Sequence, residues 1–227
     1  MVIDSKKVIN GLDCPKQLLF MGSGQTKTPK DWLSLPSIRI NSRTFEQCPD
    51  NIYGVITWPS SKDGGLGGVI KGKNKGINIP NIFLFNHLEA VGSDVGWFKD
   101  TKIYTFPVLE RYSFKELKEY VTACNKLEYP PRNSNGLWIV LWLLYANVEE
   151  IYISGYDGWM CHSGKERGQW QVENKYYDCN GTLWAPNDYK EIENGNYFFH
   201  NLYTEWLAIE AAIKKARERG VVVTVAK

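Results

Sequence analysis

The sequence lacks an excess of either charge and has no long hydrophobic run. It contains 27 Lys and Arg residues and 25 Asp and Glu residues, for a formal net charge of +2. A protein that binds nucleic acid through a large positive field needs a larger net positive charge, so that class of protein is disfavoured. Local basic patches are compatible with a net charge of +2. The apolar segment 137–145 is much shorter than the roughly 20 residues that span a bilayer. We therefore expect no membrane span.

Cysteine and histidine are scarce, and neither forms a typical metal-ligand pattern. The five cysteines include no Cys-x-x-Cys pair, and Cys161 and His162 are directly adjacent. Adjacent residues rarely supply two ligands to one ion, so we expect free thiols and no structural metal. The N-terminal residues also lack the charged-then-apolar order of a secretory signal peptide, which predicts a cytoplasmic protein.

The order of the remaining patterns is typical of an α/β fold. Strands are predicted at 16–21, 37–40, 51–58, 79–85, 149–155 and 221–225. Helices are predicted after a Thr28 N-cap with Pro29 at the first helical position, after a Ser113 cap, over the apolar segment 136–146, and over 201–219 before Gly220. We therefore expect a single Rossmann-like domain over 1–227, with a mostly parallel, twisted sheet, flanking helices and 149–155 as a central strand.

Two stretches interrupt this alternation. Segment 60–76 is rich in glycine and lysine and is predicted to be a mobile loop. Segment 160–199 is polar, aromatic and irregular, and a stretch of this length without clear elements usually forms a functional lid. We expect the lid to exclude water from a reactive donor.

Small polar residues follow the first two predicted strands, where parallel sheets bind ligands. Gly22-Ser23-Gly24 follows the first strand and Asn41 follows the second. A glycine loop lets backbone N–H groups approach a phosphate. The G-x-G-x-x-G fingerprint is incomplete because Lys27 takes the place of its last glycine, and no acidic residue ends the second strand. The pattern therefore favours a nucleotide other than a nicotinamide dinucleotide.

Two later segments add polar groups that have alternative roles. Ser134-Asn135-Gly136 opens the predicted apolar helix, either as an N-cap or as an anion-binding helix start. Asp157, after the predicted central strand, either hydrogen-bonds a ribose or base or closes an Asx-turn with Gly158.

His200 stands at the start of the last predicted helix, with Glu205 five residues later. A helix N-terminus disfavours the imidazolium, so a neutral ring there can accept a proton. His200 is therefore either a general base or a solvent-facing helix cap.

Taken in order, these segments resemble the CMP-sialic acid-dependent sialyltransferases. Segment 134–159 is similar to the small-residue turn, apolar helix and strand ending in G-x-D of the bacterial enzymes, and the spacing from His200 to Glu205 is similar to the last motif of the animal enzymes. The resemblance implies a metal-independent, inverting glycosyltransferase without a cofactor. It would move sialic acid or a related sugar from a CMP-linked donor to an acceptor hydroxyl, with a glycan as the expected acceptor.

The resemblance also implies roles for individual residues. His200 would be the general base, with Glu205 in the same catalytic motif. The implied donor-binding residues are Gly22, Ser23, Gly24 and Asn41 for CMP, Ser134, Asn135 and Gly136 for the carboxylate or phosphate of the donor, Gly155 and Asp157 for the cytidine, and Trp159 near the leaving phosphate.

Two positions depart from the bacterial pattern. Ser23 stands where those enzymes commonly have Asn, and Trp159 stands where they have a Tyr that supports the leaving phosphate. An indole N–H donates one hydrogen bond but does not reproduce a phenol. A lid tyrosine is therefore expected to supply a further phosphate contact, and the candidates are Tyr176, Tyr177 and Tyr189.

Two other functions are compatible with the residues. Lys71, Lys73 and Lys75, together with the nine tryptophans, would suit a glycosyltransferase that modifies a hydroxylated base in nucleic acid. A catalytically silent nucleotide- or glycan-binding module would keep the same fold. The presence of both His200 and Glu205 favours an enzyme over a silent module.

Overall fold

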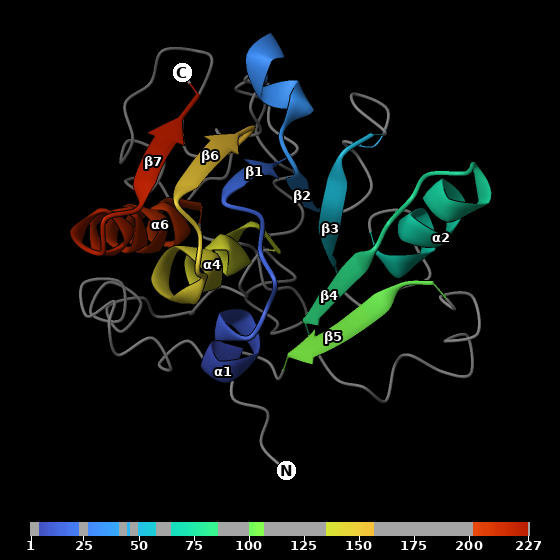
Figure 1. The fold of residues 1–227 in the computed structure, drawn as a ribbon, viewed down its shortest axis with the longest axis horizontal. Coiled ribbons are helices and arrows are strands. Elements are labelled where there is room, and N and C mark those ends of the chain that lie inside the picture. The colour runs from blue at the N-terminus through green and yellow to red at the C-terminus, as the bar shows by residue number, and fades with distance from the viewer. Residues whose placement is uncertain are drawn as a thin grey trace, which may run out of the picture.

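A seven-stranded, all-parallel sheet forms the centre of the fold (Figure 1). The computed structural model describes residues 5–22, 27–40, 45, 50–57, 65–85, 100–106, 135–156 and 202–226. The strands are β1 (Gln17–Met21), β2 (Ser37–Ile40), β3 (Ile52–Thr57), β4 (Asn81–Phe85), β5 (Lys102–Phe106), β6 (Glu150–Ser154) and β7 (Val222–Val225). They lie in the order β5-β4-β3-β2-β1-β6-β7. The chain thus adds strands outward from β1 to β5, then crosses to the other side of β1, so the order reverses between β1 and β6.

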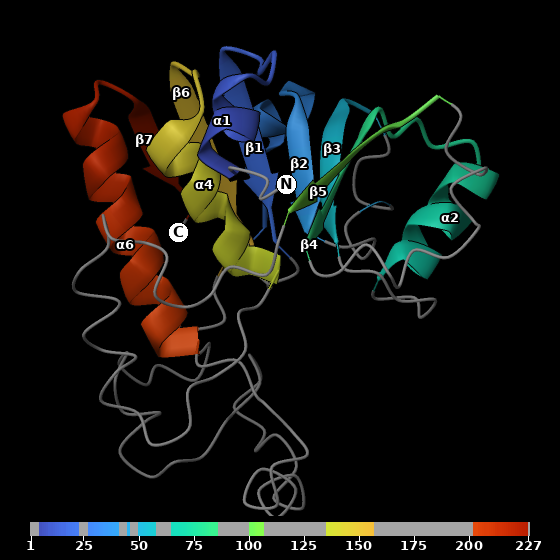
Figure 2. The same cartoon turned by 90° about the horizontal axis from the view of Figure 1, so that it is seen from below.

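Helices cover both faces of this sheet. On one face lie α1 (Ser5–Asn10), α4 (Ile139–Tyr145) and α6 (Leu202–Glu218), which stand in front of the strands in Figure 2. The 3-10 helix η1 (Lys30–Ser34) and α2 (Leu66–Asn74) lie on the other face. Helices on both faces of a parallel sheet define a doubly wound, Rossmann-like α/β fold. The predicted fold class is therefore confirmed.

The larger core lies between the sheet and α4. All residues of α4 from Ile139 to Leu144 are buried, as predicted for an apolar helix held between a sheet and other elements. Trp142 packs edge-on against Phe20 of β1 and Phe83 of β4, with ring centroids 5.7 and 4.9 Å apart. The helix begins with a 3-10 turn, η4 (Asn135–Trp138).

The C-terminal helix and strand also agree with the sequence pattern. Buried residues of α6 recur at helical spacing, namely Ile209, Ala212, Ile213 and Ala216. Gly220 follows the helix with a φ of 86°, a left-handed conformation typical of a residue just past a helix end. The predicted helix and final strand are therefore confirmed.

The predicted mobile loop at 60–76 is wrong for 66–74, which form α2. Leu66 and Val69 are three residues apart and are buried against the sheet in a second, smaller core. Gly72 faces Phe45, and a Cβ atom at this position would lie 2.8 Å from the phenyl ring. This glycine therefore allows close packing in a helix, although glycine usually indicates a turn.

Two further predictions are corrected. Thr28 is not the N-cap and Pro29 is not the first helical residue, because Pro29 itself occupies the cap position of η1 and makes no side-chain cap bond. The hydroxyl of Thr28 instead pairs with that of Ser154 at 2.9 Å. Strand 149–155 is interior but not central, since β6 is second from the edge and β2 stands at the middle of the sheet.

Other predictions lie partly or wholly outside the described residues. Cys14 is a free thiol, and the other four cysteines lie outside. The predicted helix after Ser113 and the predicted lid at 160–199 lie outside as well. Within the part of the chain that the structure describes, no helix has the length and apolar character of a membrane span.

Candidate functional site at the carboxyl edge of the sheet

Two glycines meet where the strand order reverses. Gly22 follows β1 and Gly155 follows β6, and the N–H of Gly22 donates a hydrogen bond to the carbonyl oxygen of Ser154 at 2.8 Å. A Cβ atom at Gly22 would lie 2.2 Å from the carbonyl oxygen of Gly155, and one at Gly155 would lie 2.6 Å from the carbonyl oxygen of Gly22. The two backbones therefore touch, and neither position has room for a side chain.

The backbone at this contact is also special in conformation. Gly155 has a φ of 69°, which L residues with a side chain rarely adopt. In doubly wound sheets, ligands bind outside the carboxyl ends of the strands at the point where the order reverses. The structure thus brings together two of the sequence-predicted donor-binding residues, Gly22 and Gly155, at this position.

A pair of hydroxyl groups lies beside the glycines. Ser154 is the last residue of β6, and its Oγ lies 2.9 Å from Oγ1 of Thr28, so that either group can donate. Thr28 leads into η1, whose Trp32 packs edge-on against Tyr152 with ring centroids 4.9 Å apart. These contacts attach the segment before η1 to the end of β6. Sequence reasoning missed the Thr28–Ser154 pair because it assigned Thr28 to a helix cap.

Tyr152 makes a further contact on β6. Its hydroxyl donates a hydrogen bond to Oε2 of Glu150 at 2.5 Å. This bond stabilises the ionised carboxylate and lowers the pKa of Glu150 below its ordinary value.

A buried arginine lies on β2, next to β1. Arg39 is 1% exposed, and its Nε donates a hydrogen bond to Oγ of Ser37 at 2.9 Å. Its Nη1 contacts the thioether sulfur of Met21, the residue before Gly22. Arg39 pairs with Met21 across the sheet, and Met21 pairs with Ser154, so these three residues form one row at the carboxyl end. The only sequence signal for this feature was an arginine inside the short apolar run that forms β2.

Thr57 ends β3 and continues the polar character of this edge. Its side chain is 0% exposed, and its hydroxyl has no hydrogen-bond partner among the residues that the structure describes. Val55, two residues earlier on the same face, pairs with Arg39. Sequence reasoning did not single out Thr57, because a threonine in a strand usually reflects β-propensity alone.

The helix start that carries Asn135 and Gly136 lies at the same edge. In Figure 2 the yellow-green end of α4 and the orange end of α6, which are their N-terminal ends, lie at the edge where the strands end. The turn η4 contacts both β3 and α6. The turn η4, which contains Gly136, therefore lies on the α4 face of the sheet, opposite to the face that carries Arg39.

The remaining predicted site residues are not described. Ser23, Gly24, Asn41, Ser134, Asp157, Trp159 and His200 lie outside the described residues, as do Tyr176, Tyr177 and Tyr189. For Asn135 and Glu205 only the backbone is described, in η4 and in the first turn of α6. His200 precedes α6 by two residues and is not described, so its role as general base stays a prediction.

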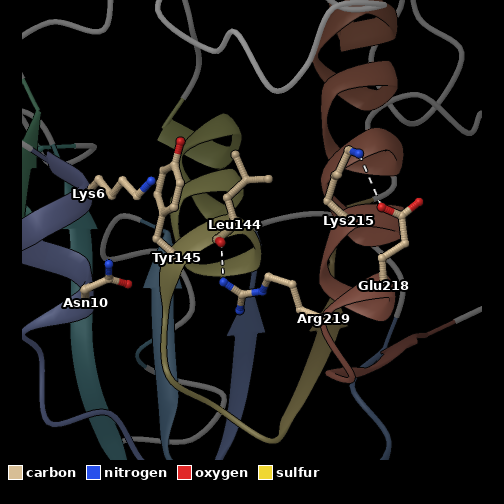
Figure 3. Close-up of a pocket in the computed structure, with 7 residues that line it drawn as sticks. All are labelled: Lys6, Asn10, Leu144, Tyr145, Lys215, Glu218 and Arg219. Atoms are coloured by element: carbon tan, nitrogen blue, oxygen red, sulfur yellow. Dashed lines mark hydrogen bonds and ion pairs between the residues drawn. The ribbon is translucent and has the colours of Figure 1, made fainter.

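An open pocket of about 670 Å³ lies at the opposite edge, where α1, α4 and α6 end (Figure 3). It is lined by Lys6, Asn10, Leu144, Tyr145, Lys215, Glu218 and Arg219. The guanidinium of Arg219 donates to the carbonyl oxygens of Leu144 and Ala146, the latter at 2.9 Å. Cations are favourable at helix C-termini, where carbonyl groups lack partners. The charge of Arg219 therefore serves the end of α4, whereas Lys215 pairs with Glu218 and the ammonium of Lys6 lies over the ring of Tyr145.

The contacts of Arg219 predict that substitutions of two residues of this pocket change the stability of the protein by different amounts. Arg219→Ala removes the donor for two carbonyl groups at the end of α4 and is expected to lower the free energy of unfolding by about 1–3 kcal/mol. Lys215→Ala removes only an exposed ion pair to Glu218 at 3.2 Å and should cost less than about 0.5 kcal/mol. Urea unfolding of both variants measures the difference, and equal losses would contradict the capping role.

The comparisons with known proteins add no relative. No family model, curated protein or solved structure matches the chain. The function therefore has to be inferred from the chain's own geometry and chemistry.

Proposed function

We propose that the chain is a glycosyltransferase that binds a CMP-linked sugar at the carboxyl edge of the sheet and transfers the sugar to an acceptor hydroxyl with inversion. The observation that carries the proposal is the contact between Gly22 and Gly155 at the point where the strand order reverses. Because neither residue has a side chain, the ends of β1 and β6 approach each other closely at the position where doubly wound folds bind ligands.

The surrounding contacts support a rigid donor site. The hydrogen bond from Gly22 to the carbonyl of Ser154 fixes the end of β1 against the end of β6. The Thr28–Ser154 hydroxyl pair then connects the segment that follows the glycine loop to the same strand end. A site whose backbone is held by rigid elements loses little conformational entropy when the ligand binds.

The position of α6 supports the proposed chemistry. This 17-residue helix begins at Leu202, and its N-terminal end lies at the edge where the strands end (Figure 2). His200 would take the proton from the acceptor hydroxyl while the acceptor oxygen bonds to the anomeric carbon, and CMP would leave with the electrons of the broken bond. Glu205, in the first turn of the same helix, belongs to the same proposed motif.

Nucleotide binding tests the proposal directly. A ligand at 100 times its dissociation constant stabilises a folded protein by about 2.7 kcal/mol, which a thermal shift assay detects. We expect CMP or CDP to raise the melting temperature and UMP and GMP to leave it unchanged. If none of the four nucleotides shifts the melting temperature, the proposed function is overturned. If only UMP does so, the proposed donor class is wrong.

The lysines that suggested a nucleic acid acceptor do not lie beside the glycine pair. Lys71, Lys73 and Lys75, which suggested contacts with nucleic acid, lie on or directly after α2 and not in a loop. The ammonium of Lys73 donates a hydrogen bond to the hydroxyl of Thr101. Moreover, α2 lies beside β4 and not beside the glycine pair between β1 and β6. We therefore propose a glycan acceptor.

A further inference from the structure

We propose that Arg217, in the last turn of α6, prevents β7 from pairing with the same strand of a second copy of this chain. Strand β7 is the outermost strand on one side of the sheet, and among the described strands it pairs with β6 alone. Its outer edge therefore carries backbone N–H and C=O groups that a further strand could bind. The inference concerns this edge and does not depend on the proposed function.

The hydrogen bonds between β6 and β7 identify the groups that face outward. The N–H groups of Val222 and Ala226 donate to carbonyl oxygens on the β6 side, at 2.9 and 2.8 Å. In a parallel pair, every second residue of a strand directs both its N–H and its C=O to the partner. Val222, Thr224 and Ala226 therefore face β6. Val223 and Val225, which alternate with them, present their backbone groups to the outer edge.

The residues of β7 offer little protection against pairing with another chain. The sequence of 221–225, VVVTV, contains no charged residue, proline or glycine. Val222 is 57% exposed, so the strand also presents an apolar side chain to solvent. At the opposite edge of the sheet, β5 begins with the exposed Lys102. A lysine on an edge strand disfavours pairing with other chains, and β7 has no residue of this kind.

Arg217 occupies one of the outward-facing acceptors. Its Nη2 donates a hydrogen bond to the carbonyl oxygen of Val223 at 2.8 Å. A second strand would have to displace the guanidinium before it could bond to this oxygen. Two copies related by a two-fold axis would each contribute one Arg217, so pairing would also bring two positive charges to the same interface. The side chain therefore opposes pairing both by occupying the acceptor and by its charge.

The end of α6 does not require this contact. The N–H groups of Gly220 and Val221 already bond the carbonyl oxygens of Arg217 and Ala216, at 2.9 and 3.0 Å. Backbone bonds of this kind close a helix end without a side chain. The need to close the helix therefore does not explain why the Arg217 guanidinium reaches the edge of β7.

The test measures self-association of Arg217→Ala and of the unmodified chain by sedimentation over a range of protein concentrations. We expect the association constant of the variant to be about tenfold higher, the effect of one hydrogen bond that the second strand no longer has to displace. Lys214→Ala is the matched control. It removes the same charge from an exposed position of the same helix, and no hydrogen bond joins Lys214 to β7 within the described part of the chain. It should associate as the unmodified chain does.

A second substitution locates the new contact. Val225→Pro removes an outward-facing N–H and leaves the bonds to β6 in place, since proline is tolerated on an edge strand where the N–H faces solvent. Added to Arg217→Ala, it should restore the association of the unmodified chain. Val222→Lys, which places a charge on the exposed face of the same strand, should have the same effect. The lysine variant keeps the test decisive if circular dichroism shows that the proline variant does not fold.

Three results would overturn the inference. The first is an Arg217→Ala variant that associates no more strongly than the unmodified chain. The second is a stronger association that the added edge substitution leaves unchanged, because the new contact would then lie away from β7. The third is an equal gain in Lys214→Ala, which would show a general effect of the lost charge. None of these results involves nucleotide binding, so each leaves the proposed function standing.

Discussion

Replacing His200 with alanine is expected to slow sugar transfer by about 10²–10⁴-fold, the usual contribution of a positioned general base. The imidazole would act on the acceptor hydroxyl and not on the donor, so the Kd for CMP should change little. The measurements are initial rates of transfer from a CMP-linked sugar and calorimetric titration with CMP. The variant should also lose the fall in rate at low pH that protonation of the base causes in the unmodified enzyme.

Two results would contradict this assignment. Equal turnover by the variant and the unmodified chain would show that His200 is not the base. A loss of CMP affinity as large as the loss of rate would place His200 in donor binding instead. His162→Ala serves as a control, because His162 lies outside the proposed catalytic motif and its loss should not remove the general base.

Replacing Gly155 with alanine is expected to destabilise the fold by about 2–5 kcal/mol and to abolish CMP binding. Two effects add. The φ of 69° would cost about 1–2 kcal/mol for a residue with a side chain. The new Cβ atom would lie 2.6 Å from the backbone oxygen of Gly22, and forcing extra atoms into a packed region costs about 1–3 kcal/mol more. Urea unfolding measures the loss of stability, and a thermal shift with CMP measures the loss of nucleotide binding.

Gly220→Ala is the matched control for this substitution. Gly220 has a similar conformation, with a φ of 86°, but no atom lies within 4 Å of the position that its Cβ would take. This variant should therefore cost only the conformational strain, about 1–2 kcal/mol, and should bind CMP normally. If both variants lose the same stability and both bind CMP, the close contact between Gly22 and Gly155 has no role in the site.

The strands nearest the middle of the sheet were the most predictable elements. β1 and β2 are buried along nearly their whole length, so they appear in the sequence as short apolar runs. The strand β5 was not predicted, because its residues are mostly only partly buried and its sequence, KIYTF, is not an apolar run, whereas the other edge strand, β7, is rich in valine. The six-residue α1 was not predicted either, since it is too short to show a clear helical period. In α2 the contact of Gly72 with Phe45 outweighs the low helix propensity of glycine.

In the candidate site, too, local sequence patterns identified some residues, whereas others depend on the folded structure. Gly22 and Gly155 were found from the sequence because a glycine directly after an apolar strand is a local signal. Thr57 and Arg39 were not found, since their significance depends on burial and on the register between strands. Thr28 shows the limit most directly, because the oxygen assigned to a helix cap bonds instead to Ser154, which lies 126 residues away in the sequence.

The order of the strands also determines when the site forms as the chain folds. β1 pairs with β2 on one side and with β6 on the other. The chain forms β2 soon after β1, but it reaches β6 only after β5. Gly22 and Gly155 are 133 residues apart, so their contact closes a long loop, and such non-local contacts form slowly. Until β6 arrives, β1 is an unpaired edge that can associate with other chains. A nucleotide at this site can therefore stabilise only chains in which both halves of the sheet have already joined.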